Sequence, residues 1–222
     1  MKVASAERLI ADLLADPQKF EDDGRAYDLL QAYFARYPVD TLRPLLASGD
    51  RRVQRAAAFV ASELGAGAAE LVDDVIPLLA AGDRRLAYDA MEILTVCCTG
   101  ERAAGMAHVA LELESGDDVL RALAMRLLGR ADASQLEAAH DHLSSGGAGA
   151  GREAHRDGLR VLADGERVEP AVVAAMIGHD DPLVRRYGAI AAHRLRKRFP
   201  ALIHAVGASP DGELRSFHRE EE

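Results

Sequence analysis

The chain has 222 residues, of which 49% are hydrophobic and only 5% aromatic, and its formal net charge at pH 7 is −9. A core built from Ala, Leu, Val and Ile without tryptophan suits close packing of helices. The acidic balance disfavours nonspecific binding of nucleic acid, which needs clustered cations, and it either favours a basic partner or simply keeps the surface soluble.

Apolar residues follow a helical period through almost the whole chain, and no alternating strand pattern competes with it. The first expected helix covers residues 4–15 and ends before Pro17, because the residue preceding a proline is pushed away from helical geometry. A second helix is expected over residues 25–36. Pairs of helices then follow, joined by Gly and Asp residues that suit a helix end and the next N-cap; they cover residues 38–64, 66–98 and 101–129.

A nine-residue segment recurs at a spacing of 33. Residues 44–52 read PLLASGDRR and residues 77–85 read PLLAAGDRR, so eight of nine positions are identical. The apolar residues Val53, Leu86 and Val119 continue the same step, and together with Val184 they are expected to be buried anchors. A fixed period in this range predicts a solenoid of stacked helical units, each packed on its neighbours.

The units after residue 130 are less regular. Helices are expected over residues 134–143 and 152–163, on either side of a glycine-rich segment, 144–151, that predicts a linker or lid rather than a phosphate-binding loop. A further pair is expected over residues 169–177 and 183–198, with Pro182 at the first helical position.

The domain prediction follows from these units. A single solenoid domain is expected over residues 1–206, with its clearest repeats at 38–198. The segment 207–222 is polar and is expected to be a fraying tail. No run of about 18 apolar residues predicts a membrane span, and charged residues in the first 15 positions argue against a signal peptide. A cytoplasmic protein is therefore expected.

The turn residues carry a family resemblance. The segments GDRRV at 49–53, GDRRL at 82–86 and DPLVR at 181–185 are similar to the HEAT-repeat family, in which an antiparallel helix pair carries a Pro in its first helix, an Asp at the turn, and Val and Arg early in its second helix. The positions that match are Pro44, Pro77, Asp50, Asp83, Asp117, Asp181, Arg55, Arg121 and Arg186. The unit at 134–163 departs from the pattern because it lacks the turn Asp.

This resemblance implies an all-α fold, an α-solenoid of about six antiparallel helical hairpins whose second helices line a concave face. It also implies that the Asp and Arg positions form a ladder between successive units, interrupted where Tyr88 replaces the Arg.

No catalytic constellation is recognisable in the sequence. Cys97 and Cys98 are adjacent in an apolar helical run and point about 100° apart, which predicts reduced core thiols. His140 and His142 diverge on a helix, so with His155 they do not predict a metal site. We therefore expect no catalytic residues, no metal and no cofactor, and the chain is expected not to be an enzyme.

The expected binding face consists of residues that share one side of the second helices and mix Arg, aromatic and acidic side chains, as protein interfaces do. These residues are Arg55, Phe59, Tyr88, Asp89, Glu92, Arg121 and Met125. Asp89 and Glu92 would receive a basic partner. The apolar members of the face have an alternative interpretation as core between units; they are Phe59, Met125, Leu128 and Ile190.

The expected function is a non-catalytic protein-interaction solenoid, such as an adaptor or a toxin-neutralising immunity protein. Two alternatives stay open, both from activities of HEAT-like proteins: a DNA-binding repair enzyme, and a lyase or maturation factor for a chromophore protein. The cationic run at residues 194–198 ends a long helix, where the helix dipole favours cations, so it does not by itself predict a nucleic-acid site.

Overall fold

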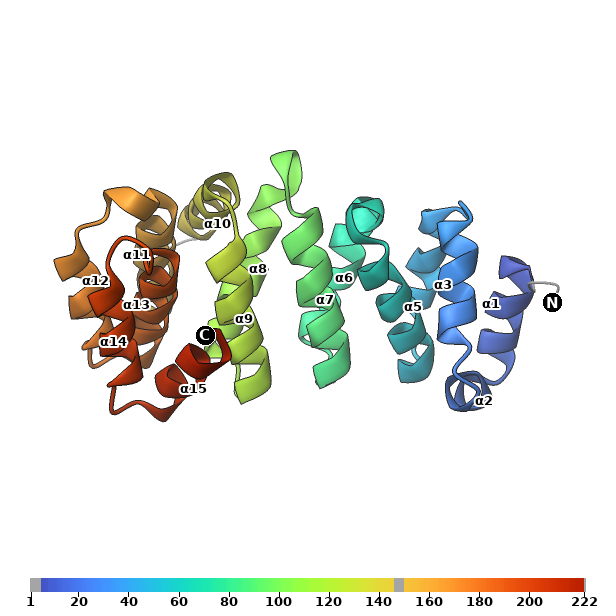
Figure 1. Ribbon diagram of the computed structural model, residues 1–222. Helices are drawn as coiled ribbons and strands as arrows, with labels where there is room; N and C mark the ends of the chain where they lie inside the picture. The colour runs from blue at the N-terminus through green and yellow to red at the C-terminus, as the bar shows by residue number, and fades with distance from the viewer. Residues whose placement is uncertain (1–4, 146–149, 222) are drawn as a thin grey trace. The chain divides into compact units, whose positions relative to one another are not determined.

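The structure, a computed structural model, describes residues 5–145 and 150–221. Every regular element in those residues is helical (Figure 1), so the prediction of an all-α protein is confirmed for them. The helices fall into two compact units, Met1–Cys98 (unit 1) and Thr99–Glu222 (unit 2). In the described part of the chain, no helix combines the length and the apolar character needed to cross a membrane.

Unit 1 is formed by short and long helices in alternation, with α3, α5 and α7 lying side by side. Its α-helices are α1 (Ala6–Ala15), α2 (Pro17–Asp22), α3 (Ala26–Phe34), α4 (Arg43–Leu46), α5 (Arg51–Glu63), α6 (Val72–Leu79) and α7 (Arg84–Cys97). Its 3-10 helices are η1 (Val39–Leu42) and η2 (Gly65–Leu71). The first helix of the pair expected over residues 38–64 is thus split into η1 and α4.

Unit 2 contains the remaining helices, in which α13 packs against α9, α11 and α12. Its α-helices are α8 (Met106–Leu111), α9 (Asp118–Arg130), α10 (Ala133–Ser145), α11 (Ala150–Asp164), α12 (Pro170–Ile177), α13 (Pro182–Arg194), α14 (Pro200–Gly207) and α15 (Gly212–Glu221). Its 3-10 helices are η3 (Gly100–Gly105), η4 (Glu112–Glu114) and η5 (Gly165–Arg167). Within the glycine-rich segment, residues 146–149 lie outside the described residues.

The repeated Asp residues are N-caps. The carboxylate of Asp50 accepts hydrogen bonds from the amides of Arg52 and Val53 at the start of α5. Such a cap satisfies backbone donors that the first helical turn leaves open. The third residue of the capped helix then points into the core, and Val53 is 2% exposed. In α7, Asp83 and the fully buried Leu86 repeat this arrangement, so both of these anchors are confirmed.

The anchor predictions at Val119 and Val184 are wrong. Val119 is 41% exposed, whereas Leu120 is buried. The cap of α9 is Asp117, 34 residues after Asp83 rather than 33, so the inward position moves by one residue. One residue rotates a side chain by about 100° around a helix. In α13, Val184 is half-buried and Leu183 is the buried residue near the helix start.

The expectation of a fraying tail from residue 207 also needs correction, because α15 occupies most of that segment. Asp211 accepts a hydrogen bond from the amide of Glu213 at 2.9 Å and so caps α15. Leu214 and Phe217, one helical turn apart, are both buried. Two apolar side chains on one face are enough to pack a helix that is otherwise polar against its neighbours.

Two glycines in unit 2 allow close helix packing. A Cβ atom added at Gly158 would lie 2.2 Å from the ring of Tyr187, and one at Gly188 would lie 2.7 Å from the backbone nitrogen of Ile177. The Tyr187 ring therefore lies directly over α11. Its hydroxyl is 2.9 Å from Nδ1 of His155, which forms a buried polar pair inside an otherwise apolar core.

Candidate binding site

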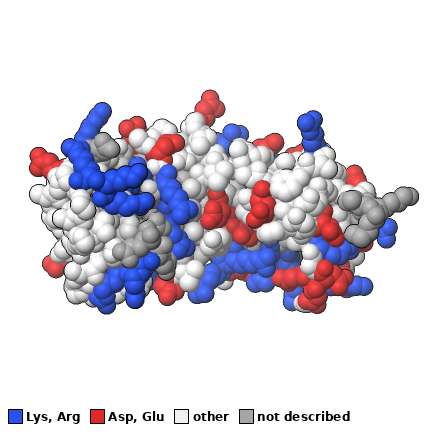
Figure 2. Space-filling view, in the orientation of Figure 1, with Lys and Arg blue, Asp and Glu red and all other residues white. Residues whose placement is uncertain are grey.

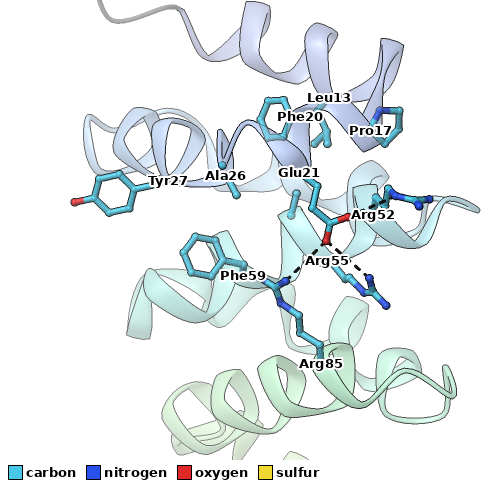
Figure 3. A pocket seen from close by; sticks show the side chains of 12 residues that line it. Leu13, Pro17, Phe20, Glu21, Ala26, Tyr27, Arg52, Arg55, Phe59 and Arg85 are labelled. Carbon is cyan, nitrogen blue, oxygen red and sulfur yellow. Dashed lines mark ion pairs between the residues drawn. The ribbon is translucent and has the colours of Figure 1, made fainter.

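Unit 1 contains a pocket of about 230 Å³ where α2, the start of α3, α5 and the first turn of α7 meet (Figure 3). Its walls combine arginines with aromatic and small apolar side chains around a single carboxylate. The lining residues are Leu13, Pro17, Phe20, Glu21, Gly24, Ala26, Tyr27, Arg52, Arg55, Ala56, Phe59 and Arg85. We call this feature the arginine pocket.

The repeat places two of its arginines. Arg52 and Arg85 are each the second helical residue after a capping Asp, in α5 and α7 respectively. Because both helices start with the same cap and bury the same third position, the two side chains emerge at equivalent places on neighbouring helices. Arg55 lies one turn further along α5. The carboxylate comes from Glu21, near the end of α2.

Glu21 is shared among three guanidinium groups (Figure 3). Its Oε atoms lie 3.5 Å from Nε of Arg52, 3.8 Å from Nη1 of Arg55 and 3.9 Å from Nη1 of Arg85. All three separations exceed the usual range for a hydrogen bond to oxygen. Within residues 5–145 and 150–221, no other carboxylate pairs with Arg52 or Arg85, so the pocket keeps an excess of positive charge.

Arg55 is held more firmly than the other two arginines. Its Nε and Nη2 atoms donate to Oδ2 of Asp83 at 2.9 Å and 2.6 Å. This contact joins α5 to the residue that caps α7. Half-exposed Arg52 and Arg85 lack such a contact, so they are the arginines that can reorient toward a ligand.

Aromatic side chains form the apolar part of the pocket. Phe20 is buried beneath it, and the guanidinium of Arg25 lies 5.2 Å from the centre of its ring. Phe59 is half-buried on α5, one helical turn beyond Arg55. Tyr27 is 61% exposed at the edge of the pocket. A ligand entering here would therefore meet cations and aromatic faces together.

The structure brings together only two of the seven expected binding residues, Arg55 and Phe59. Tyr88 is 38% exposed and Glu92 half-buried, both on α7 outside the lining of the pocket. Asp89 is buried, which disfavours the expected contact of its side chain with a basic partner. Desolvation raises the pKa of Asp89 to about 6, with Arg85 opposing the rise and Glu63 and Glu92 adding to it.

The two expected residues of unit 2 have internal partners. Nε of Arg121 donates to Oε1 of Glu213, on α15, at 2.7 Å. Met125 is fully buried, as are Leu128 and Ile190, which agrees with their alternative interpretation as core. In unit 2, Glu213 of α15 thus pairs with Arg121, which the sequence analysis assigned to a partner protein.

The sequence interpretation missed Glu21, Tyr27, Arg52 and Arg85. A signal for the two arginines was present, since the Arg-Arg pairs at 51–52 and 84–85 are part of the repeat itself. Glu21 and Tyr27 lie before the first repeated segment, and no spacing connects them to it. Only the packing of α2 and α3 against the repeat helices brings them to the same pocket.

The three histidines that the sequence analysis considered as a metal site do not form one cluster. His155 is buried against Tyr187, His140 lies beside Asp141 at 3.0 Å, and the ring of His142 is 5.9 Å from that of His108. No group of three potential metal ligands was found among the residues that the structure describes. The side chains of Cys97 and Cys98 are buried, and Sγ of Cys97 donates to the carbonyl of Gly65 at 3.3 Å.

The chain matches no family model and no curated protein sequence. Among solved structures it is similar to the crystal structure of an engineered protein, a structural genomics target. The similarity has a TM-score of 0.52 at 17% sequence identity and covers 97% of this chain and 94% of that one. At this identity the likeness concerns the fold alone.

Proposed function

We propose that this chain is a non-catalytic protein-binding module of the HEAT-repeat type, and that a partner protein docks at the arginine pocket of unit 1. The partner presents an acidic side chain beside an aromatic or aliphatic one. This proposal keeps the interaction role expected from the sequence. It replaces the expected basic partner with an acidic one, because three of the four charged residues that line the pocket are arginines.

The observation that carries the proposal is the sharing of Glu21 among Arg52, Arg55 and Arg85 at 3.5–3.9 Å. An incoming carboxylate can take bidentate hydrogen bonds from Arg52 or Arg85 that Glu21 does not take at these distances. Phe59 and Tyr27 add contact area next to the charge. Arginine and tyrosine are among the residues that contribute most to binding at protein interfaces.

The pocket is small compared with a whole interface, so it acts as an anchor for one or two partner side chains. A stable protein complex buries about 1,200–2,000 Å² in total, and a few residues within that area supply most of the affinity. The exposed side chain of Tyr27 extends the anchor across the adjoining surface of α3.

A displayed library of random peptides, selected on the immobilised protein, tests this proposal without a known partner. We expect enrichment of Asp or Glu next to an aromatic or aliphatic residue. The double variant Arg52→Gln/Arg85→Gln should lose this enrichment and weaken the selected peptides at least tenfold in an anisotropy titration. A double variant with the same charge change at exposed residues of unit 1 outside the pocket, Arg8→Gln/Lys19→Gln, should keep both.

Enrichment of Lys or Arg would restore the original expectation of a basic partner and refute the proposed one. Equal binding of the selected peptides by wild type and by Arg52→Gln/Arg85→Gln would show that the arginine pocket is not the docking site. The melting curves of the variants serve as folding controls, and both doubles change only exposed or half-exposed side chains.

A further inference from the structure

A second concave region, in unit 2, lies between the end of α9 and the end of α13 and has a volume of about 640 Å³. Five of its lining residues are cationic, and none of the lining side chains that the structure describes is a carboxylate; the cations are Arg126, Arg130, Arg194, Arg196 and Lys197. We call it the basic hollow. Figure 2 shows Lys and Arg gathered over the part of unit 2 where Figure 1 places α9 and α13.

Such a concentration of positive charge is unusual for this chain, which is acidic overall. Arg130, Arg196 and Lys197 are exposed, and none of the three has an ion pair with another described residue. Like charges held together repel one another, so the cluster weakens the folded state unless an anion offsets it. Arg130, Arg196 and Lys197 are therefore available to a ligand.

Arg194 places a positive charge in the basic hollow that is held in position by hydrogen bonds. Its Nη1 atom donates to the carbonyls of Leu128, Gly129 and Ala131 at 3.3, 3.2 and 2.7 Å, at the C-terminal end of α9. These carbonyls carry the negative end of the helix dipole, which would otherwise repel an anion. With the carbonyls occupied by a guanidinium, the end of α9 becomes compatible with bound negative charge.

His193 is a second and independent indication of a ligand. It lines the basic hollow and is only 6% exposed, yet neither of its ring nitrogens has a hydrogen-bond partner among the residues that the structure describes. Its ring packs 4.8 Å from that of Phe217 and 5.8 Å from that of His218. Buried polar groups are almost always paired, so an unpaired one beside a cationic concavity is typical of a functional position.

We infer that the basic hollow binds a compact ligand that carries at least two phosphate groups. Its volume lies in the range of small-molecule sites. Several cations around one concavity match several negative charges, and the planar guanidinium groups of Arg130 and Arg196 suit phosphate oxygens. This site lies entirely in unit 2 and does not depend on the arginine pocket or on the proposed protein partner.

Isothermal titration of the full chain with inorganic phosphate, pyrophosphate and tripolyphosphate tests the inference. We expect the affinity to rise at least tenfold from phosphate to pyrophosphate and to fall as salt is raised from 50 to 300 mM, because each phosphate contact adds charge neutralisation. Arg196→Gln/Lys197→Gln should weaken pyrophosphate binding at least tenfold, and Arg130→Gln alone about threefold.

The matched control is Arg102→Gln/Arg160→Gln, which removes two exposed cations from unit 2 outside the basic hollow. It should change the pyrophosphate affinity less than twofold. Three results would overturn the inference: no heat of binding for any phosphate up to 5 mM, an equal loss in the control double, or binding of a 20-nucleotide DNA strand without binding of pyrophosphate or tripolyphosphate. The last would mean that the cations recognise a polymer backbone.

Discussion

Arg55 and Asp83 join two successive repeats through a single carboxylate. Oδ1 of Asp83 accepts the amides of Arg85 and Leu86 at 3.0 and 3.2 Å and caps α7, while Oδ2 accepts both hydrogen bonds from Arg55 of α5. Unit 2 uses the same device, since Asp211 caps α15 through Oδ1 and accepts Nε of Arg185 at 3.0 Å through Oδ2. The capping residue thus also sets the position of the helix against its neighbour.

The two roles of Asp83 can be separated by substitution. Asp83→Asn keeps a good N-cap but removes the charge that pairs with Arg55, whereas Asp83→Ala removes both. We expect the Ala variant to be less stable than the Asn variant by about 1 kcal/mol, the usual contribution of a cap. Denaturant melts of both variants, and of each combined with Arg55→Gln, measure this.

The double-mutant cycle of Arg55→Gln and Asp83→Asn should give a coupling free energy of about 0.5–1 kcal/mol. The value is small because the Arg55 side chain is one-third exposed and solvent weakens the ion pair. Desolvation raises the pKa of Asp83, but hydrogen bonds from Arg55 and the backbone outweigh it, so the pKa is lowered. The coupling is then present above about pH 4 and is lost as the pH falls through the lowered pKa. A coupling of zero at pH 7 would mean that the pair is only a surface contact.

Asp89 should make stability depend on pH in the opposite direction. Its folded-state pKa of about 6 lies above the value near 3.9 of an unfolded chain. The folded state therefore binds the proton more tightly, and stability falls as the pH rises from about 4 to 6. Asp89→Asn should stabilise the protein at pH 7.5 by on the order of 2 kcal/mol and have little effect at pH 3.5.

Thermal melts of wild type and Asp89→Asn across this pH range provide the measurement. Glu92→Gln, one turn away on the same face of α7, is the matched control, since Glu92 is only half-buried. If Asp89→Asn shifts the melting temperature equally at pH 3.5 and pH 7.5, then folding does not raise the pKa of Asp89.

The register of α9 can be checked with two adjacent residues. Leu120 is 7% exposed and Val119 is 41% exposed. Leu120→Ala should cost about 2–4 kcal/mol because it removes buried carbon and leaves a cavity, whereas Val119→Ala should change stability by less than about 0.5 kcal/mol. Urea melts of the two variants decide between the registers. A larger loss for Val119→Ala would favour the spacing of 33 over the spacing of 34.

Glu213 should hold α15 in place. It accepts a hydrogen bond from Arg121 at 2.7 Å and another from Arg186 at 3.0 Å, and all three side chains are mostly buried. Glu213→Gln would leave two partly buried guanidinium groups without a counter-charge, which should cost about 2–3 kcal/mol. Hydrogen exchange of the α15 amides should accelerate at least tenfold relative to wild type.

The control for α15 is Ser216→Ala, an exposed position of the same helix. It should leave both stability and exchange nearly unchanged. Loss of stability in Glu213→Gln without faster exchange in α15 would show that Glu213 supports α9 and α13 but does not retain the last helix.

The sequence by itself determined the helical class and the starts of the main helices. Asp50, Asp83 and Asp117 each cap a helix, a local effect in which a carboxylate bonds to amides two and three residues along the chain. The anchors Val53 and Leu86 follow from those caps for the same reason. Short-range chemistry of this kind does not depend on the remainder of the fold, so it can be read from spacing.

Only the tertiary structure decided which surfaces are free. Arg52 and Arg121 both lie within the first four residues of a helix, yet one faces the arginine pocket and the other pairs with Glu213, 92 residues further along the chain. Whether such an arginine is exposed or paired depends on burial and desolvation by residues far away in the sequence. Glu213, on the short helix α15, is such a residue for Arg121. The local spacing of residues does not predict where that helix packs.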